Sequence, residues 1–230
     1  MAIGATSVRE WFAVRCPDDS VSQIATRAGI GRVTLHQQLV RGNVPEASVI
    51  AIARSLRLPP IQELASFQPY GDLVPSRPAA REVLAFIDWP RLFPAVGRVF
   101  EAQEISESDL GEPLYPDSSR VWVESIDTGF LRKKVESELG LASSNVASAL
   151  RSTLKLPLAL AFATHAGTPL ASAFVVTGLL TPAEAGWDPE ERKAALLSTD
   201  MPQLLELVGT RAAMAEKHLR RIRKFEEDLS

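Results

Sequence analysis

A glycine between two short amphipathic segments is the feature that most constrains how this chain can fold. Ser20 and Gln23 have the spacing of a capping box, which marks the first turn of a helix. Gly29 follows about two turns later, where a residue that tolerates positive φ is typical of a helix end. A second segment then places Leu35 and Leu39 four residues apart, on one helical face. The spacing predicts two short helices joined by a tight turn.

Similar apolar spacing extends this pattern through the first 67 residues. Ser7 and Glu10 have capping-box spacing ahead of another apolar face, and two more amphipathic segments follow Pro45, so residues 1–67 predict a domain of five short helices. Residues 68–79 are rich in helix breakers and predict a linker. These breakers are Pro69, Gly71, Pro75 and Pro78.

Residues 80–230 predict a second helical domain, so the expected fold class is mainly α. The alternation of Val121 with Val123 allows one short strand. The apolar residues of segment 156–180 predict the core of this domain. Residues 201–230 predict a long terminal helix with an apolar stripe. The stripe comprises Leu204, Leu205, Val208, Ala212, Ala215, Leu219 and Ile222.

Two helices across a glycine turn are typical of a helix-turn-helix that reads the DNA major groove. The segment SVSQIATRAGI, residues 20–30, resembles the core of the phage-repressor (Cro/C1, Xre) family. The segment AGIGRVTLHQQL, residues 28–39, with VIAIAR at 49–54, is similar to immunity repressors of actinobacterial phages and prophages. The resemblance implies a repressor that binds double-stranded DNA at lytic promoters, and in some members a second DNA-contacting region. This chain departs from the pattern at Gln37, where the family has an arginine.

Burial of Leu35 and Leu39 turns the polar side chains of their segment outward, where arginine, glutamine and threonine are base-reading types. Ser22, Arg27 and Asn43 are better placed for phosphates. A solvated amphipathic helix with no ligand is the alternative interpretation. The predicted DNA-binding residues are Ser22, Arg27, Arg32, Val33, Thr34, His36, Gln37, Arg41 and Asn43.

The charge distribution agrees with this assignment only locally. The net charge of the chain is −3, whereas nucleic-acid binding requires a basic surface. Residues 20–58 nevertheless contain five arginines and one acidic residue, Glu46. Local charge is therefore compatible with a DNA partner.

A shift of 111 residues aligns Gly29 with Gly140 and Leu39 with Leu150, which suggests a second helix-turn-helix-like unit over residues 125–183. The same shift puts Glu136 in place of Ala25, where a tight helix crossing tolerates no carboxylate. An ordinary helical oligomerisation domain is therefore the alternative, and the second domain could mediate self-association. The candidate second DNA contacts are Arg132, Lys133, Lys134, Ser143, Ser144, Asn145, Ser148 and Arg151.

Other chemistry finds no support in the sequence. His36, His165 and His218 are far apart and Cys16 is the single cysteine, so we expect no metal site, no cofactor and no catalytic residues. No Walker loop or dinucleotide fingerprint occurs. The longest apolar run, residues 158–163, is well short of the ~18 residues of a membrane helix. We expect a soluble protein of the bacterial cytoplasm.

The sequence predicts a non-enzymatic transcriptional repressor, and two other classes remain. A ligand-sensing host regulator would use the apolar segment 156–180 as an effector pocket. An antitoxin-like module would use the helix-turn-helix fold to bind a protein.

Overall fold

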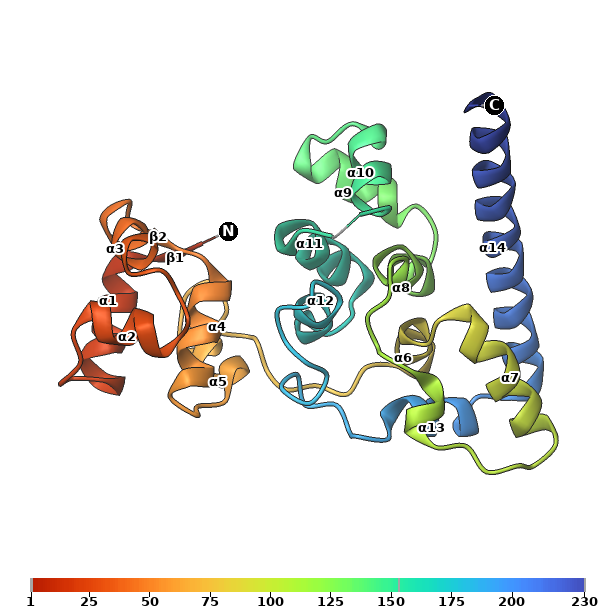
Figure 1. Cartoon of the computed structure of the whole chain (residues 1–230), viewed down its shortest axis with the longest axis horizontal. Helices are drawn as coiled ribbons and strands as arrows, with labels where there is room; N and C mark the ends of the chain where they lie inside the picture. Colours follow the sequence, from red (N-terminus) through yellow and green to blue (C-terminus); the bar gives the residue numbers. More distant parts are fainter. Residues whose placement is uncertain (1, 153, 230) are drawn as a thin grey trace.

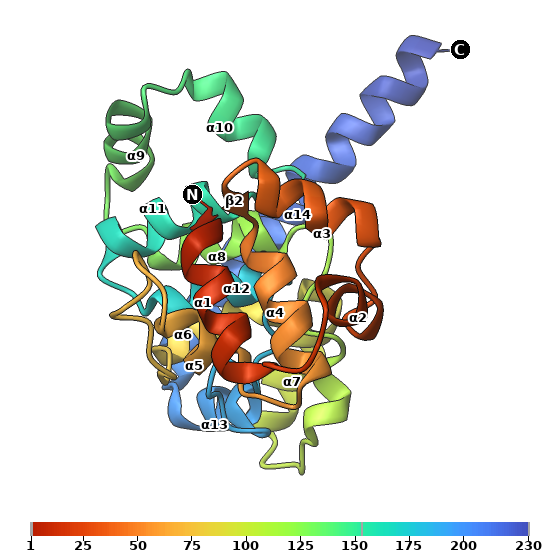
Figure 2. The ribbon, with the colours of Figure 1, turned by 90° about the vertical axis from the view of Figure 1, so that its left-hand side faces the viewer.

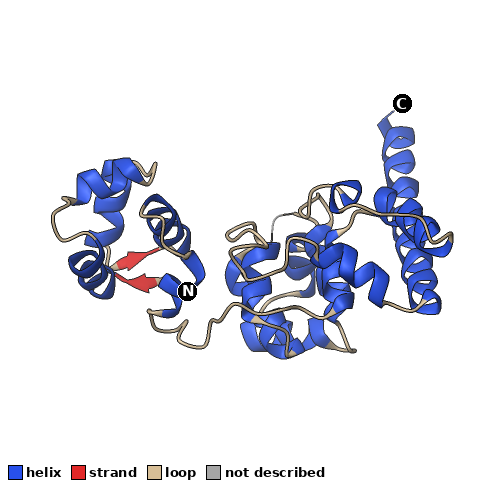
Figure 3. Cartoon of the chain, turned by 90° about the horizontal axis from the view of Figure 1, so that it is seen from below, coloured by secondary structure: helices blue, strands red, loops and turns tan. Residues whose placement is uncertain are grey.

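The computed structural model describes residues 2–152 and 154–229, and this part of the chain is mainly α-helical (Figures 1 and 3). It contains fourteen α-helices, two short 3-10 helices and one two-stranded sheet. The N-terminal elements are β1 (Ile3–Gly4), α1 (Ala5–Arg15), α2 (Val21–Arg27), α3 (Arg32–Val40), β2 (Asn43–Val44), α4 (Glu46–Ser55) and α5 (Pro60–Ala65).

The five helices predicted in the first 67 residues are confirmed, as is the capping box of Ser20 and Gln23 at the start of α2. The predicted cap at Ser7 is wrong. α1 begins two residues earlier, at Ala5, because β1 pairs antiparallel with β2 and the Ala5 N–H donates to the Gly42 carbonyl at 2.9 Å. Both partners of this short sheet are distant in sequence, so local patterns do not reveal it.

Helices α8–α12 follow the same order as α1–α5. They are α8 (Ser118–Ile126), α9 (Leu131–Leu139), α10 (Ser143–Ala149), α11 (Leu156–Ala166) and α12 (Leu170–Val176). The strand suggested by Val121 and Val123 is therefore wrong. Both lie in α8 with the fully buried Trp122 between them, so this helix is buried on more than one side and shows no simple period.

The turns of the two five-helix sets share their geometry. Gly29 after α2 has φ of 67° and Gly140 after α9 has φ of 60°. In each turn the N–H of the next residue donates to the carbonyl five residues earlier, at 2.9 Å. This is the Schellman arrangement of a helix C-terminus. Leu35 of α3 and Val146 of α10 are both buried at the sequence shift of 111 residues.

The later turns also correspond. The Leu58 N–H donates to the Ala53 carbonyl at 2.9 Å, and the Thr168 N–H donates to the Ala163 carbonyl at 3.0 Å. A proline then occupies the N-cap of both α5 and α12. The correspondence begins with α8, so it starts earlier than residue 125.

Tyr70, between the two five-helix sets, is 1% exposed. Its hydroxyl donates to the Glu46 carboxylate, and its ring meets that of Phe174 edge-on with centroids 5.6 Å apart. Burial, together with Glu46, raises the pKa of Tyr70, which keeps the hydroxyl protonated. Residues 68–79 are thus packed in the interior at this point.

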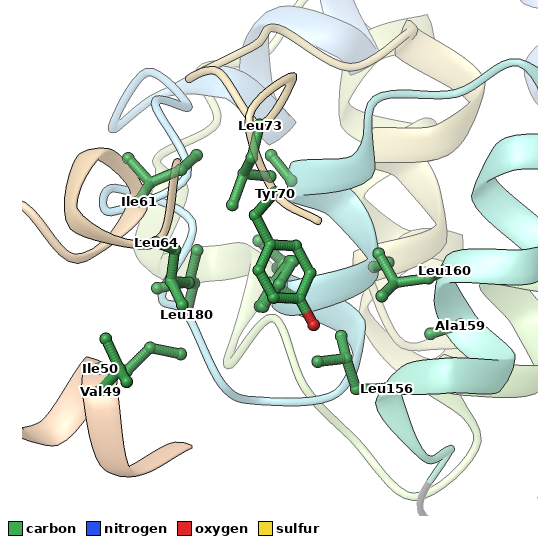
Figure 4. Packing of buried hydrophobic residues seen from close by; sticks show 14 of the residues in the cluster. Val49, Ile50, Ile61, Leu64, Tyr70, Leu73, Leu156, Ala159, Leu160 and Leu180 are labelled. Carbon is green, nitrogen blue, oxygen red and sulfur yellow. The ribbon is translucent and has the colours of Figure 1, made fainter. Parts of the chain in front are cut away.

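One hydrophobic cluster consequently extends from α1–α5 through Tyr70 into α11 and α12. Figure 4 shows the Tyr70 ring between Leu64 of α5 and Leu160 of α11. On the surface, Arg54 of α4 reaches across to Glu184 with two contacts of 2.6 Å. The two sets are joined by both core and surface contacts.

A separate cluster is built from segments on either side of α8–α12. Its elements are α6 (Ala80–Val83), η1 (Leu84–Phe86), α7 (Trp89–Phe100), η2 (Glu107–Leu110), α13 (Glu191–Ser198) and α14 (Met201–Leu229). α7 and α14 pack along each other (Figure 1). The predicted terminal helix is confirmed, although Leu205 is exposed and the side chains of Leu219 and Ile222 lie outside the described part. No helix in the described ranges is long and apolar enough to span a bilayer.

Glu82 of α6 is a fully buried carboxyl that accepts a 2.8 Å hydrogen bond from the Trp122 indole. Burial raises its pKa above the ordinary value of 4.5. Because the folded state holds this proton more tightly than the unfolded state, the ionised carboxyl destabilises the fold as pH rises above 4.5.

Replacing Glu82 with glutamine should therefore raise the free energy of unfolding at pH 7.5, and the gain should shrink toward pH 4.5. Urea denaturation at both pH values measures it. Glu104→Gln, at an exposed site, is the control and should show no such trend. A glutamine variant whose stability difference is independent of pH would contradict the assignment.

Candidate nucleic-acid interface

The outer face of α3 is the centre of the candidate interface. Leu35 and Leu39 are buried and hold the helix against the core. Val33, Gln37 and Val40, spaced i, i+4 and i+7, form an exposed row on the opposite side. Val33 is 69% and Val40 is 68% exposed. A helix held by two leucines thus presents one amide and two apolar side chains outward.

All nine residues predicted to contact DNA are exposed and come from α2, α3 and the turn that follows it. The structure brings them together on one side of α1–α5. They are Ser22 and Arg27 on α2, Arg32, Val33, Thr34, His36 and Gln37 on α3, and Arg41 and Asn43 after it.

A groove of about 430 Å³ lies between the N-terminal halves of α2 and α3. Arg27 closes one side through an ion pair with Asp19, with contacts of 2.8 and 2.9 Å. Arg32 donates from Nε to the Thr26 hydroxyl at 3.1 Å. A phosphate at Arg27 would have to compete with Asp19, whereas Arg32 is held only by a neutral hydroxyl.

The local positive charge is distributed differently from the sequence count. Glu46 is buried against Tyr70, away from α3. Arg54 is held by Glu184, whose carboxylate raises the pKa of the guanidinium. Arg54 therefore joins the two five-helix sets and does not add to the charge around α3.

The second predicted set lies on α9, α10 and the end of α10. Lys133, Lys134, Ser144, Asn145, Ser148 and Arg151 are exposed. Arg132 is half-buried and held by Glu124 at 3.1 Å. Ser143 donates to the Glu136 carboxylate at 2.7 Å. These two side chains already have protein partners.

Glu136 does not enter the helix crossing, as the shift by 111 residues implied. Its side chain is half-exposed and lies at the N-terminus of α10, where it accepts from Ser143. A carboxylate at a helix N-terminus is favoured by the exposed N–H groups there. The residue therefore fits the turn without occupying the position of a small core side chain.

Figures 1 and 2 place α3 and α10 on the same upper side of the molecule. Sequence reasoning missed two exposed side chains there. Val40 continues the row of Val33, and that spacing could have indicated it. Phe130 is 73% exposed before α9, with the Lys133 ammonium 5.5 Å from its ring centroid. No local pattern singled out Phe130.

Other predicted chemistry is placed as follows. The segment 156–180 provides core side chains such as Phe162 and Phe174, both fully buried, so the structure fills that region rather than hollowing it. Burial raises the pKa of Cys16, opposite to the shift of a reactive thiol. Within the described ranges, no group of three His, Cys, Asp or Glu residues is arranged to hold a metal.

Comparison of the chain with family models, with curated proteins and with solved structures finds no match. The candidate interface therefore rests on its own geometry.

Proposed function

We propose that the protein is a sequence-specific double-stranded DNA-binding repressor that inserts α3 into a major groove. The observation that carries the proposal is the outer face of α3. A short helix, positioned by a glycine turn and two buried leucines, exposes Arg32, Val33 and Gln37 together. Arginine suits guanine, glutamine suits adenine, and valine suits a thymine methyl group.

The phosphate contacts in this proposal come from the surroundings of α3. Ser22 and Arg27 flank the groove beside α2, and Arg41 and Asn43 follow the C-terminal end of α3. Such contacts set the orientation of a protein on the duplex without reading the sequence. Repression would be steric, through occupation of a promoter. The resemblance to phage immunity repressors favours a lytic promoter.

A second DNA contact through α9 and α10 is part of the same proposal. The turn at Gly140 matches the turn at Gly29, and α8–α12 repeat the element order of α1–α5. We regard α8–α12 as a degenerate helix-turn-helix-like unit whose Lys133, Lys134 and Arg151 contact phosphates. Two different readers in one chain would bind an asymmetric site.

Two arginine variants test the separate roles in this proposal. Arg32→Ala should reduce the preference for a selected duplex over a scrambled one by ~1 to 3 kcal/mol, because a base contact is lost. Arg27→Ala should weaken both duplexes by similar factors. Fluorescence anisotropy titrations at fixed salt measure both effects. Equal losses on the two duplexes for Arg32→Ala would contradict its base-reading role.

A further inference from the structure

Arg211 of α14 is a buried cation that lacks an ionic partner in the described part of the chain. Its side chain is 5% exposed. Its one hydrogen bond among the described residues runs from Nη1 to the Tyr115 hydroxyl at 3.2 Å. No described carboxylate lies within 4.0 Å of it. Burial lowers the pKa of this guanidinium, which reflects the free-energy cost of an uncompensated charge.

Arg211 also lies where three hollows meet. A cavity of about 280 Å³ opens between α7, α8 and α14, and neighbouring hollows of about 170 and 470 Å³ share the same arginine. The first volume is many times the ~30 Å³ share of one water molecule and close to the lower end of ligand sites, ~300 Å³. A small organic molecule fits there.

The walls of the 280 Å³ cavity are largely apolar. Trp89 and Pro90 of α7 face Val121 of α8 and Met214 of α14 across it. Trp89 is half-exposed at the mouth, which leaves an aromatic face open to a ligand. Apolar walls with one or a few convergent polar groups are typical of small-molecule sites.

The carboxylates around the cavity do not neutralise Arg211. Asp88 accepts from the Arg91 N–H at the start of α7. Glu124 is paired with Arg120 at 3.2 Å and with Arg132 at 3.1 Å. Asp117 is half-exposed and therefore reaches water. The buried positive charge remains available to an incoming anion.

We propose that this cavity binds a small organic carboxylate, with the carboxylate on Arg211 and an apolar body against Trp89 and Met214. Guanidinium and carboxylate match in a bidentate geometry. The site lies outside the candidate nucleic-acid interface, so the inference goes beyond the proposed function and does not depend on it. Since α8 opens the second five-helix set, a bound ligand would fix that set against α7 and α14.

The test uses the full-length protein and a panel of aryl and alkyl carboxylates, from benzoate to 4-phenylbutyrate and from butyrate to octanoate, each paired with its neutral amide. At saturation, at least one carboxylate should raise Tm by roughly 5 °C and its amide should not. Tryptophan fluorescence should change in the same titration, because Trp89 lines the cavity. A panel with no carboxylate-specific shift overturns the proposal.

Arg211→Met keeps the length of the side chain and removes its charge. It should abolish the difference between acid and amide. Arg98→Met, on α7 but paired with Asp109 at the surface, is the matched control and should keep that difference. If Arg211→Met does not fold, Trp89→Leu replaces it and should weaken carboxylate binding at least tenfold. Unchanged binding in both variants would place the ligand elsewhere and overturn the assignment.

Discussion

Tyr70→Ala is expected to lower the free energy of unfolding by about 3–5 kcal/mol, the range for removal of a large buried aromatic side chain. The ring is 1% exposed and lies between α5 and α11 (Figure 4). Its loss would leave a cavity in the cluster that joins α1–α5 to α11 and α12. We therefore also expect the single unfolding transition to split into two.

Tyr70→Phe separates packing from hydrogen bonding. The ring and its edge-on contact with Phe174 remain, but the buried Glu46 carboxylate loses its donor. The expected cost is about 1–3 kcal/mol, with one transition retained. Calorimetry and urea denaturation measure both variants. An alanine variant as stable as the wild type would show that residues 68–79 act as a simple connector.

Gln37→Glu is expected to weaken DNA binding by about 3 kcal/mol or more, roughly 100-fold, and to change stability by less than ~0.5 kcal/mol. The side chain keeps its size, but the amide donor is replaced by a carboxylate. In the centre of the exposed row of α3, that carboxylate would face the electronegative groove. Loss of the donor and like-charge repulsion act in the same direction.

The control for charge alone is Gln62→Glu, on the exposed side of α5 in the same five-helix set. It makes the same change in net charge, and α5 lies on the opposite side of that set from α3 (Figure 1). Anisotropy titrations should show near wild-type affinity. If both variants lose affinity equally, the effect belongs to net charge and α3 is not the reading helix.

The elements that sequence predicts well are those with local signals. The box of Ser20 and Gln23, the glycine at position 29 and the leucines of α3 act within one or two turns, and all three are present as predicted. The exposure of the nine candidate residues follows from the same local geometry. Local physics suffices for this part of the site.

The features that the sequence did not reveal depend on distant partners. β1 pairs with β2 some forty residues away, and Arg54 meets Glu184 across the two five-helix sets. α8 resembled a strand because its surroundings bury consecutive residues around Trp122. The buried Arg211 has no sequence signature, since an arginine in a terminal helix is ordinarily solvated. Tertiary packing decides each case.

Selection of bound duplexes from a random library by the full-length protein, near physiological salt, tests the central claim most directly. Salt matters because nonspecific affinity rises steeply as it falls. The account predicts an enriched, asymmetric motif that Gln37→Glu abolishes. A symmetric motif with half-sites about 34 Å apart would indicate a dimer of single readers instead. No enrichment by the folded protein would contradict DNA recognition by α3.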